Sequence, residues 1–354
     1  MQVYRAALVG VGRMGAFIDN EVAGRGPSLP YSHSAGYEAC DRTELIAGAD
    51  MRADVLEKFG DRYGVPKERQ YTDFRQMILS EKPDILSIAT QPHQRAEVAL
   101  FAIENGVRAL YVEKPLCASM DEADALLAAC KKHGTVLNMG TNRRWHPGFA
   151  DMRAAIASGD YGRLATLEIE SRATLFNTQS HWIDTLRVLN GDAEAIWAQA
   201  YMPDGPASID GDSVVNDPYT EGMIAFENDV IAHLVARPGG HVFRAWCEQA
   251  ELIARGDGAF EIRKADGEVI TIPYEPVSST VRLIEDIVQS LDTGNPTRGG
   301  IDAAYKNAEI LFALLESEKR AGARVAIPLV GSTLAFRPTN LAPRQPKYEP
   351  VVKA

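Results

Sequence analysis

The feature that most constrains the fold is a glycine-rich segment near the start of the chain. Residues 3–9 form an apolar run that predicts a buried strand, and Gly10-Val11-Gly12-Arg13-Met14-Gly15 follows it directly, before a predicted helix start at Ala16. This G-x-G-x-x-G spacing after a strand is typical of dinucleotide-binding βαβ units, in which the glycines permit a tight turn and a close approach to a pyrophosphate. The free N–H groups at the helix start face that anion. We therefore expect a dinucleotide to be bound by Gly10, Gly12, Arg13, Met14 and Gly15.

An acid at the end of the following strand is the second part of this pattern. The apolar run Glu44 to Ala49 ends in Asp50, later than expected, because the Gly- and Pro-rich segment Asn20 to Pro30 is predicted to be an inserted loop. Asp50 can accept both ribose hydroxyls, which favours NAD. Arg52 could instead bind a 2′-phosphate, so NADP stays open.

Strand and helix patterns then alternate at short spacing. Strands are predicted at 84–90, 107–112 and 135–139, and helices at 54–63, 73–80, 94–105 and from Ser119-Met120-Asp121-Glu122, which is a capping-box pattern. Such alternation predicts an α/β fold with a parallel sheet. Functional groups in such sheets follow the carboxyl ends of strands. Thr90 and His93 follow one strand and Glu113-Lys114-Pro115 follows the next, so we expect all of them except Pro115 to contact the cofactor.

The second half of the chain has a different pattern, in which apolar and polar residues alternate. Period-two strands are predicted at 164–170, 194–200, 222–226, 230–236, 248–254 and 268–272, with helices around 181–186, 281–291 and 302–319. These strands favour a large open, mostly antiparallel sheet. We predict a Rossmann domain at 1–120, a substrate and oligomerisation domain at 121–330, and an extended Pro-containing tail at 331–354.

Charge and composition exclude several classes of function. The net charge of −11 disfavours nucleic acid and anionic membranes as partners. No apolar run reaches the roughly 20 residues of a membrane span, and the first residues lack a signal-peptide pattern. The four cysteines form no CxxC pair, so we expect reduced thiols, no metal site and a cytoplasmic location.

In their order along the chain, these motifs resemble the glucose–fructose oxidoreductase, inositol dehydrogenase and rhizopine-catabolism (Gfo/Idh/MocA) family. The resemblance covers roughly residues 1–330. It rests on Gly10 to Gly15, Asp50, Thr90 with His93, Glu113-Lys114-Pro115, Arg144 with Pro147, and His181-x-x-Asp184 with Leu189 and Gly191.

The resemblance implies hydride transfer between NAD(P) and a hydroxyl-bearing carbon of a sugar, sugar derivative or cyclitol. It further implies that Lys114 binds the reacting oxygen, that His181 is the acid/base, and that the Lys114–Pro115 bond is cis. Glu113 is expected near the nicotinamide ribose. A homo-oligomer, dimer or tetramer, is expected because an open sheet face needs cover.

One departure from the family concerns the residue four positions before His181. The family's dehydrogenases usually have Asp there, and this chain has Asn177, which keeps hydrogen bonding but loses the charge. A redox-neutral, NAD-dependent cleavage of glycosides therefore stays open. A non-enzymatic NAD-binding sensor is a third alternative, which loss of Lys114 or His181 would favour, and both residues are present.

Five residues are candidates for substrate contacts: Arg144, Arg172, Asn177, Trp182 and Asp184. Each also has a structural interpretation, namely ion pairing across the domain boundary for Arg144, a core position for Trp182 and an exposed helix acid for Asp184. His33, His146, His233 and His241 carry no comparable signal.

Overall fold

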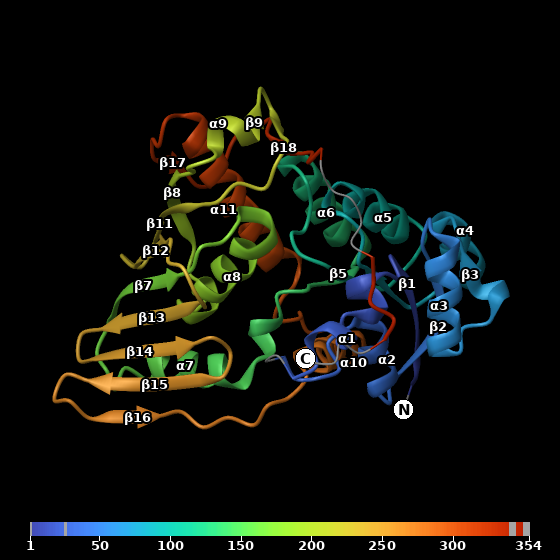
Figure 1. Cartoon of the computed structure of the whole chain (residues 1–354), viewed down its shortest axis with the longest axis horizontal. Coiled ribbons are helices and arrows are strands. Elements are labelled where there is room, and N and C mark those ends of the chain that lie inside the picture. The colour runs from blue at the N-terminus through green and yellow to red at the C-terminus, as the bar shows by residue number, and fades with distance from the viewer. Residues whose placement is uncertain (1, 25–26, 340–344, 350–354) are drawn as a thin grey trace.

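The computed structural model describes residues 2–24, 27–339 and 345–349, and contains two large sheets (Figure 1). The first has six strands in the order β3-β2-β1-β4-β5-β6, all parallel, which is the doubly wound arrangement of a Rossmann domain. Its strands are β1 (Tyr4–Val9), β2 (Thr43–Ala49), β3 (Gln70–Tyr71), β4 (Ile85–Ile88), β5 (Ala109–Val112) and β6 (Val136–Met139). The intervening helices are η1 (Arg13–Phe17), α1 (Asp19–Val22), α2 (His33–Ala39), α3 (Ala53–Tyr63), η2 (Lys67–Arg69), α4 (Phe74–Glu81), α5 (Pro92–Glu104) and α6 (Met120–His133).

The strand order reverses between β1 and β4, and the glycine segment lies at this point. Gly10 has φ +88°, and a Cβ there would lie 2.8 Å from the carbonyl oxygen of Ala89. At Gly15 a Cβ would lie 2.1 Å from the carbonyl oxygen of Gly10. Both positions therefore require glycine, which is what the sequence pattern predicts.

The helix that follows β5 begins as the sequence predicts. Ser119 Oγ accepts from the N–H of Glu122 at 3.2 Å, and Glu122 Oε2 accepts from the N–H of Ala118 at 2.7 Å. This is a capping box. The strand after the helix, β6, completes the parallel sheet, so the sheet extends past residue 120, where the sequence analysis placed the domain boundary.

The second sheet has nine strands in the order β16-β15-β14-β13-β7-β12-β11-β8-β17. Only β7 and β12 are parallel neighbours, so the sheet is mostly antiparallel, as expected. The strands are β7 (Leu164–Glu170), β8 (Ala195–Tyr201), β11 (Glu221–Phe226), β12 (Ile231–Val235), β13 (Val242–Cys247), β14 (Ala250–Arg255), β15 (Ala259–Lys264), β16 (Val269–Thr271) and β17 (Val325–Ala326). The sequence analysis did not predict β13 and β15.

Helices and short strands complete this second part. They are η3 (Asn142–Trp145), α7 (Pro147–Ser158), η4 (Leu175–Gln179), α8 (Ser180–Leu189), α9 (Gly205–Ser208), α10 (Ser279–Thr293), α11 (Ile301–Lys319), β9 (Ile209–Asp210), β10 (Ser213–Val214) and β18 (Ala335–Phe336). The sequence analysis missed α2 and α7. In the inserted segment 20–30, predicted as a loop, α1 extends to Val22, and residues 25–26 lie outside the described part.

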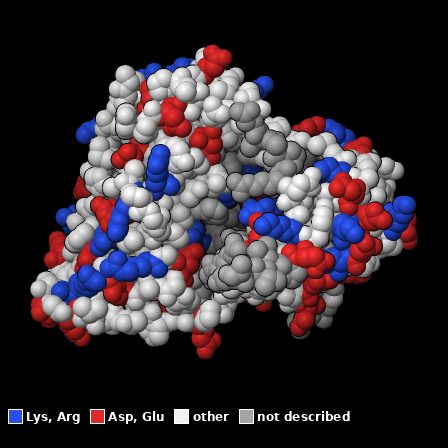
Figure 2. All heavy atoms as spheres, viewed as in Figure 1, with Lys and Arg blue, Asp and Glu red and all other residues white. Residues whose placement is uncertain are grey.

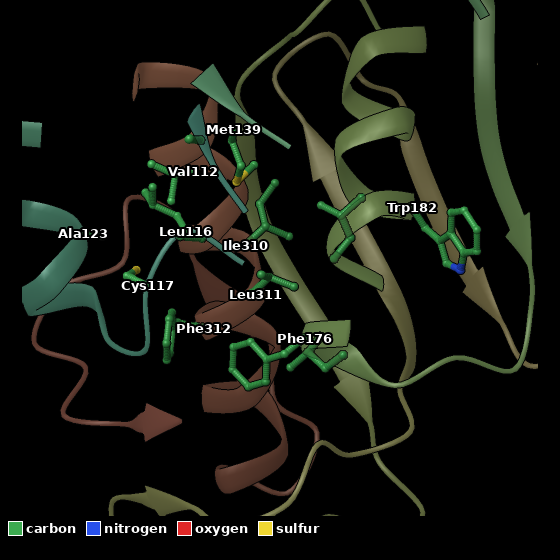
Figure 3. Packing of buried hydrophobic residues seen from close by; sticks show 14 of the residues in the cluster. Val112, Leu116, Cys117, Ala123, Met139, Phe176, Trp182, Ile310, Leu311 and Phe312 are labelled. Carbon is green, nitrogen blue, oxygen red and sulfur yellow. The ribbon is translucent and has the colours of Figure 1, made fainter. Parts of the chain in front are cut away.

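The two sheets share one hydrophobic core. Helix α11 packs against β8 on one side and α6 on the other. Figure 3 shows its Ile310 and Leu311 close to Leu116, with Phe312 beside Phe176 of η4. Helix α10 belongs to the late part of the chain but packs against α2 and β5 of the parallel sheet. The apolar faces of late helices thus join the two parts and fix the cleft between them.

The outer surface is mixed in charge. Figure 2 shows Lys and Arg interleaved with Asp and Glu over the nine-stranded sheet, and a hollow between the two parts of the molecule. On this sheet Arg244 pairs with Glu170 and Glu251. None of the described helices combines the length and apolarity that crossing a membrane requires.

Candidate active site at the edge of the parallel sheet

Lys114 lies at the carboxyl edge of the parallel sheet, where β5 ends in Glu113-Lys114-Pro115. Buried Arg95 fixes this turn, because its guanidinium donates to the carbonyl oxygens of Pro115 at 2.5 Å and Thr90 at 2.8 Å. The Lys114–Pro115 bond is cis, as expected. Burial lowers the pKa of Lys114 to about 8, while the carboxylate of Glu113 opposes this shift. Lys114 is thus a cation that can lose its proton within the neutral to mildly alkaline range.

The amino group of Lys114 contacts the turn that precedes α8. Its Nζ donates to the backbone oxygen of Asn177 at 2.5 Å and approaches Asn177 Oδ1 at 3.3 Å. Asn177 lies in η4, which leads directly into the helix that carries His181. The contact therefore brings the end of β5 against the start of α8.

Asp217 holds the same turn from the other side. Its two carboxylate oxygens accept from the N–H groups of Phe176 at 2.7 Å and Asn177 at 2.8 Å. Burial raises the pKa of Asp217, and these hydrogen bonds together with the charge of Lys114 limit the rise. The sequence analysis missed Asp217, because nothing in the irregular segment around it marks it as a functional residue.

His181 is half-buried at the start of α8. Burial lowers its pKa well below the ordinary value, and the positive charges of Lys114 and Arg143 act in the same direction. Within the part of the chain that the structure describes, its Nδ1 has no hydrogen-bond partner. The ring is therefore a neutral base at pH 7 with one nitrogen unused.

Beneath Lys114 lies a buried chain of polar groups that starts at Glu113. His33 Nε2 lies 3.1 Å from Glu113 Oε1, and His33 Nδ1 lies 3.0 Å from Ser87 Oγ, which also contacts the Tyr37 hydroxyl at 2.8 Å. The His33 ring stacks on Tyr111 with ring centroids 3.7 Å apart. Burial alone would raise the pKa of Glu113, but the His33 hydrogen bond and nearby cations lower it below its ordinary value. Sequence reasoning passed over His33, whose partners come from other strands.

An aromatic and charged wall lies beside His181. The Trp182 ring packs on His241 at 4.3 Å between centroids, and the guanidinium of Arg143 lies 4.4 Å from the Trp182 ring centroid. Arg143 forms two 2.8 Å hydrogen bonds with Asp257. Burial alone would raise the pKa of Asp257, but Arg143 and His241 together lower it. Trp182 is 6% exposed, yet its indole N–H has no partner among the described residues.

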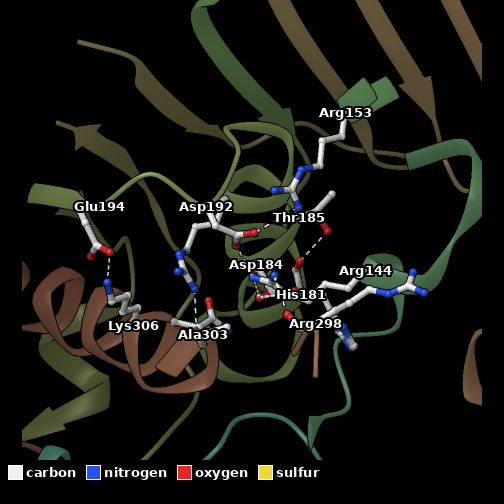
Figure 4. Close-up of polar contacts among 12 residues, drawn as sticks. Arg144, Arg153, His181, Asp184, Thr185, Asp192, Glu194, Arg298, Ala303 and Lys306 are labelled. Atoms are coloured by element: carbon white, nitrogen blue, oxygen red, sulfur yellow. Dashed lines mark hydrogen bonds and ion pairs between the residues drawn. The ribbon is translucent and has the colours of Figure 1, made fainter. Parts of the chain in front are cut away.

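Arg144 and Asp184, which the sequence analysis predicted to bind substrate, form a buried ion pair with each other. Arg144 and Asp184, 6% and 1% exposed, form hydrogen bonds of 2.8–2.9 Å, and Arg144 also donates to Asp192 and to the backbone of Arg298 (Figure 4). Burial alone would lower the pKa of Arg144, but the two carboxylates outweigh it and raise the pKa. The substrate roles expected for Arg144 and Asp184 are therefore not supported, because this buried ion pair already uses their polar atoms. The interpretation of Asp184 as an exposed acid is also wrong.

The dinucleotide edge is formed by the glycine segment and the end of β2. Arg52 Nε donates to Asp50 Oδ1 at 3.2 Å, and the Arg52 guanidinium covers Gly12, where an added Cβ would lie 2.8 Å from Nη2. Arg52 Nη1 is shielded and has no partner within the described ranges. Arg52 Nη1, the Asp50 carboxylate and the glycine segment thus lie together, and these groups fit the hydroxyls of the adenosine ribose of a dinucleotide.

The other residues predicted to bind cofactor or substrate are half-buried or exposed. Arg13 and Met14 are half-buried in η1, and Arg13 Nε donates to Glu21 at 2.8 Å. Thr90 is half-buried at the end of β4, whereas the side chain of His93 is exposed on α5. Arg172 is exposed and lies over the Tyr219 ring at 4.7 Å, and Tyr219 pairs with Thr174, directly before η4.

Comparisons with known proteins agree with this geometry. Residues 4–141 match the model of an oxidoreductase family with an NAD-binding Rossmann fold, Gfo/Idh/MocA. The chain is 29% identical over 131 residues to D-apiose dehydrogenase of Paraburkholderia graminis, which is 37% of this chain and 34% of that protein. It is 25% identical over 168 residues to myo-inositol 2-dehydrogenase of Thermotoga maritima, or 48% of this chain and 45% of that protein. The matched segments thus span a third to a half of these relatives.

The whole fold matches solved structures. An inositol dehydrogenase homologue from Azotobacter vinelandii, complexed with NADH and myo-inositol, superposes with a TM-score of 0.76 at 16% identity and covers 92% of this chain and 98% of that one. At this identity the match establishes the fold alone. The family match covers the glycine segment, Asp50 and the Lys114 turn, and the fold match extends over both sheets. Residues 4–141 therefore match the NAD-binding Rossmann domain of the Gfo/Idh/MocA oxidoreductase family, and the chain as a whole has the fold of this solved structure.

Proposed function

We propose that this protein is an NAD-dependent oxidoreductase that transfers a hydride between the nicotinamide and a hydroxyl-bearing carbon of a sugar, sugar derivative or cyclitol. The observation that carries the proposal is the contact of Lys114 Nζ with Asn177 at 2.5 Å. It joins the carboxyl edge of a dinucleotide-binding sheet to the helix that bears His181, so a cation and a neutral base share one cleft. An alcohol oxidation needs these two groups.

In the oxidative direction, the substrate hydroxyl lies between Lys114 and His181. The neutral imidazole of His181 accepts the hydroxyl proton, which its depressed pKa permits at pH 7. The ammonium group of Lys114 stabilises the negative charge that develops on the oxygen. Bound NAD supplies the hydride acceptor. In the reductive direction the same two groups return the proton and polarise the carbonyl.

Neighbouring residues hold these two groups in position. Asp217 fixes the backbone of Asn177, which in turn receives the hydrogen bond from Lys114. His33 fixes the carboxylate of Glu113 below the turn, where it limits the loss of charge from Lys114 and faces the nicotinamide ribose in our proposal. The groups that react are therefore oriented before the substrate binds.

The wall beside His181 suits a ring that carries several hydroxyl groups. Three shielded polar atoms lack partners in the described part of the molecule: the indole N–H of Trp182, Thr141 Oγ1 and Asn142 Oδ1. Thr141 and Asn142 follow β6 at the same sheet edge as Lys114. A polyol would satisfy such atoms, and the Trp182 face would pack on its C–H groups. The names of the relatives, apiose and myo-inositol dehydrogenases, are consistent with this substrate class.

The proposal is tested by incubating the purified protein with NAD or NADP and a panel of aldoses, glycosides and cyclitols, and following reduced nicotinamide. We expect formation of NADH with at least one polyol and none with the Lys114→Met variant, which should still bind NAD. Tyr201→Ala, at a 63% exposed position on β8, serves as the control variant. Tight NAD binding without NADH formation from any polyol would contradict the proposal.

We also propose that the parallel-sheet part binds the cofactor, and that the nine-stranded sheet supports the substrate site and association with further copies. The exposed strands of this sheet carry Trp246 and Val269, which are 43% and 56% exposed. Light scattering of the purified protein would measure the order of the oligomer. The cytoplasmic location expected from the sequence stays a prediction.

A further inference from the structure

The tail of the chain returns to the dinucleotide edge of the parallel sheet. It is first anchored at β18, where the N–H of Phe336 donates to the carbonyl oxygen of Ala118 at 2.7 Å. Residues 345–349 then lie beside α1 and η1 (Figure 1). Asn20 Nδ2 donates to the carbonyl oxygen of Lys347 at 2.7 Å. The described tail residues, 331–339 and 345–349, are therefore in contact with both parts of the molecule, and residues 340–344 and 350–354 of the predicted tail lie outside the described part.

Tyr348 makes the closest contact of this tail with the glycine-rich region. Its ring meets Phe17 edge to face, with ring centroids 4.9 Å apart and planes at 89°. Phe17 is buried at the end of η1, two residues after Gly15. The guanidinium of Arg62 lies 5.5 Å from the centroid of the Phe17 ring. Tyr348 thus extends the aromatic surface next to the segment that binds the pyrophosphate.

The hydroxyl of Tyr348 is shielded and has no hydrogen-bond partner among residues 2–24, 27–339 and 345–349. Burial raises the pKa of this hydroxyl, and the charges of Asp54, Arg52 and Asp50 also act on it. Arg52 Nη1 is a second shielded atom without a partner in the same described ranges. Two shielded polar atoms without partners are unfavourable unless a ligand forms hydrogen bonds with them.

We propose that Tyr348 is a cofactor-binding residue, and that residues 345–349 form the outer wall of the adenosine end of the NAD site. Asp50 ends β2, the position at which this fold receives the adenosine ribose. Arg52 lies between Asp50 and Gly12, so its free N–H and the Tyr348 hydroxyl face the ribose oxygens. The Tyr348 ring, backed by Phe17, closes this end against solvent. The inference rests on the proposed function, because it needs a bound dinucleotide.

The test measures binding rather than turnover. Calorimetric titrations would compare three probes: NAD, ADP-ribose, which lacks the nicotinamide, and nicotinamide mononucleotide, which lacks the adenosine. The variants are Tyr348→Phe, Tyr348→Ala and a chain that ends at Thr339, with Tyr201→Ala as the control at an exposed tyrosine of β8. Thermal unfolding without ligand shows whether each variant is folded.

We expect Tyr348→Ala and the shortened chain to weaken NAD and ADP-ribose binding about tenfold, as for the loss of an aromatic contact and a hydrogen bond. The affinity for nicotinamide mononucleotide should be unchanged. Tyr348→Phe should lower the affinity for NAD and ADP-ribose about threefold, because it removes only the hydrogen bond of the hydroxyl. Unchanged NAD affinity in the shortened chain overturns the inference, and so does tighter binding, which would mean that the tail occupies the site. If the unaltered protein fails to bind ADP-ribose, the proposed function falls as well.

Discussion

The amino group of Lys114 donates a hydrogen bond of 2.5 Å to the backbone oxygen of Asn177 and lies 3.3 Å from its side-chain oxygen. The two residues are 63 positions apart along the chain. The family pattern has a carboxylate at position 177, and this protein has a neutral amide there. A carboxylate does contact this turn, because Asp217 accepts from the N–H group of Asn177. Burial lowers the pKa of Lys114, and the carboxylates of Glu113 and Asp217 oppose this shift.

The pH dependence of the oxidation should follow Lys114. Because its pKa is lowered to about 8 by burial, the ammonium form is present below pH 8 and is lost above it. We expect kcat/KM to be nearly constant up to about pH 7, to be halved at about pH 8, and to fall about tenfold per pH unit well above 8. Initial rates with the best polyol substrate would measure this. A decline that stays at the same pH in Lys114→Arg, whose guanidinium keeps its charge, would contradict the assignment.

Replacing Asn177 by Asp should move the alkaline decline of kcat/KM to higher pH. The new carboxylate would stand about where Oδ1 stands now, 3.3 Å from Nζ, and an opposite charge at this distance favours the ammonium form. We expect a higher pKa for Lys114 and retained or increased activity at pH 9. Asn177→Ser, which adds no charge, is the control. If both variants have the same profile, a carboxylate at position 177 does not act on the charge of Lys114, and the expectation is wrong.

Asp217→Asn should shift the alkaline decline of kcat/KM to lower pH. This change removes a negative charge that supports the Lys114 ammonium, so the pKa of Lys114 should fall below 8. It also weakens the hydrogen bonds to the N–H groups of Phe176 and Asn177. We expect a lower kcat at pH 8 with near-normal kcat at pH 6.5. An equal loss at both pH values would indicate a purely structural role for Asp217.

His181→Asn should lower kcat about 10²–10⁴-fold, the usual contribution of a general base. In the unaltered protein, the pKa of His181 lies well below 6.5, so we expect no acidic decline between pH 6 and 7. The unfolded chain takes up a proton at His181 near pH 6.5 while the folded chain does not, so acidification below this pH lowers stability through this group. Urea unfolding of both proteins at pH 5 and 7 would show a smaller pH effect in the variant.

Arg144→Met should destabilise the fold rather than change substrate affinity. The change leaves Asp184 buried without its cation, which costs about 3–5 kcal/mol. Urea unfolding measures this loss, and KM of the remaining folded protein should be unchanged. The double variant Arg144→Met/Asp184→Leu should regain part of the stability, because no unpaired charge is left. A large rise in KM would restore the substrate role predicted from the sequence.

Local patterns were sufficient for the parallel sheet and for the Lys114 turn. Glycines at 10 and 15 are required by contacts within one βα unit, and the Ser119–Glu122 cap involves neighbours in sequence. Such signals can be read because the interacting groups are a few residues apart. The strands β13 and β15 were missed because their alternation is short and interrupted.

What the sequence by itself determined is the Rossmann domain and the NAD-binding segment, since both follow from spacing within a segment. The roles of Lys114 and His181 were implied by the resemblance of their motifs to a known family. Only the tertiary structure decided that Arg144 neutralises Asp184, that His33 bonds Glu113, and that Asp217 holds Asn177. The same is true of Tyr348 on Phe17. These partners lie far apart along the chain. Their contacts depend on how the helices and sheets bury their apolar faces, which no local pattern encodes.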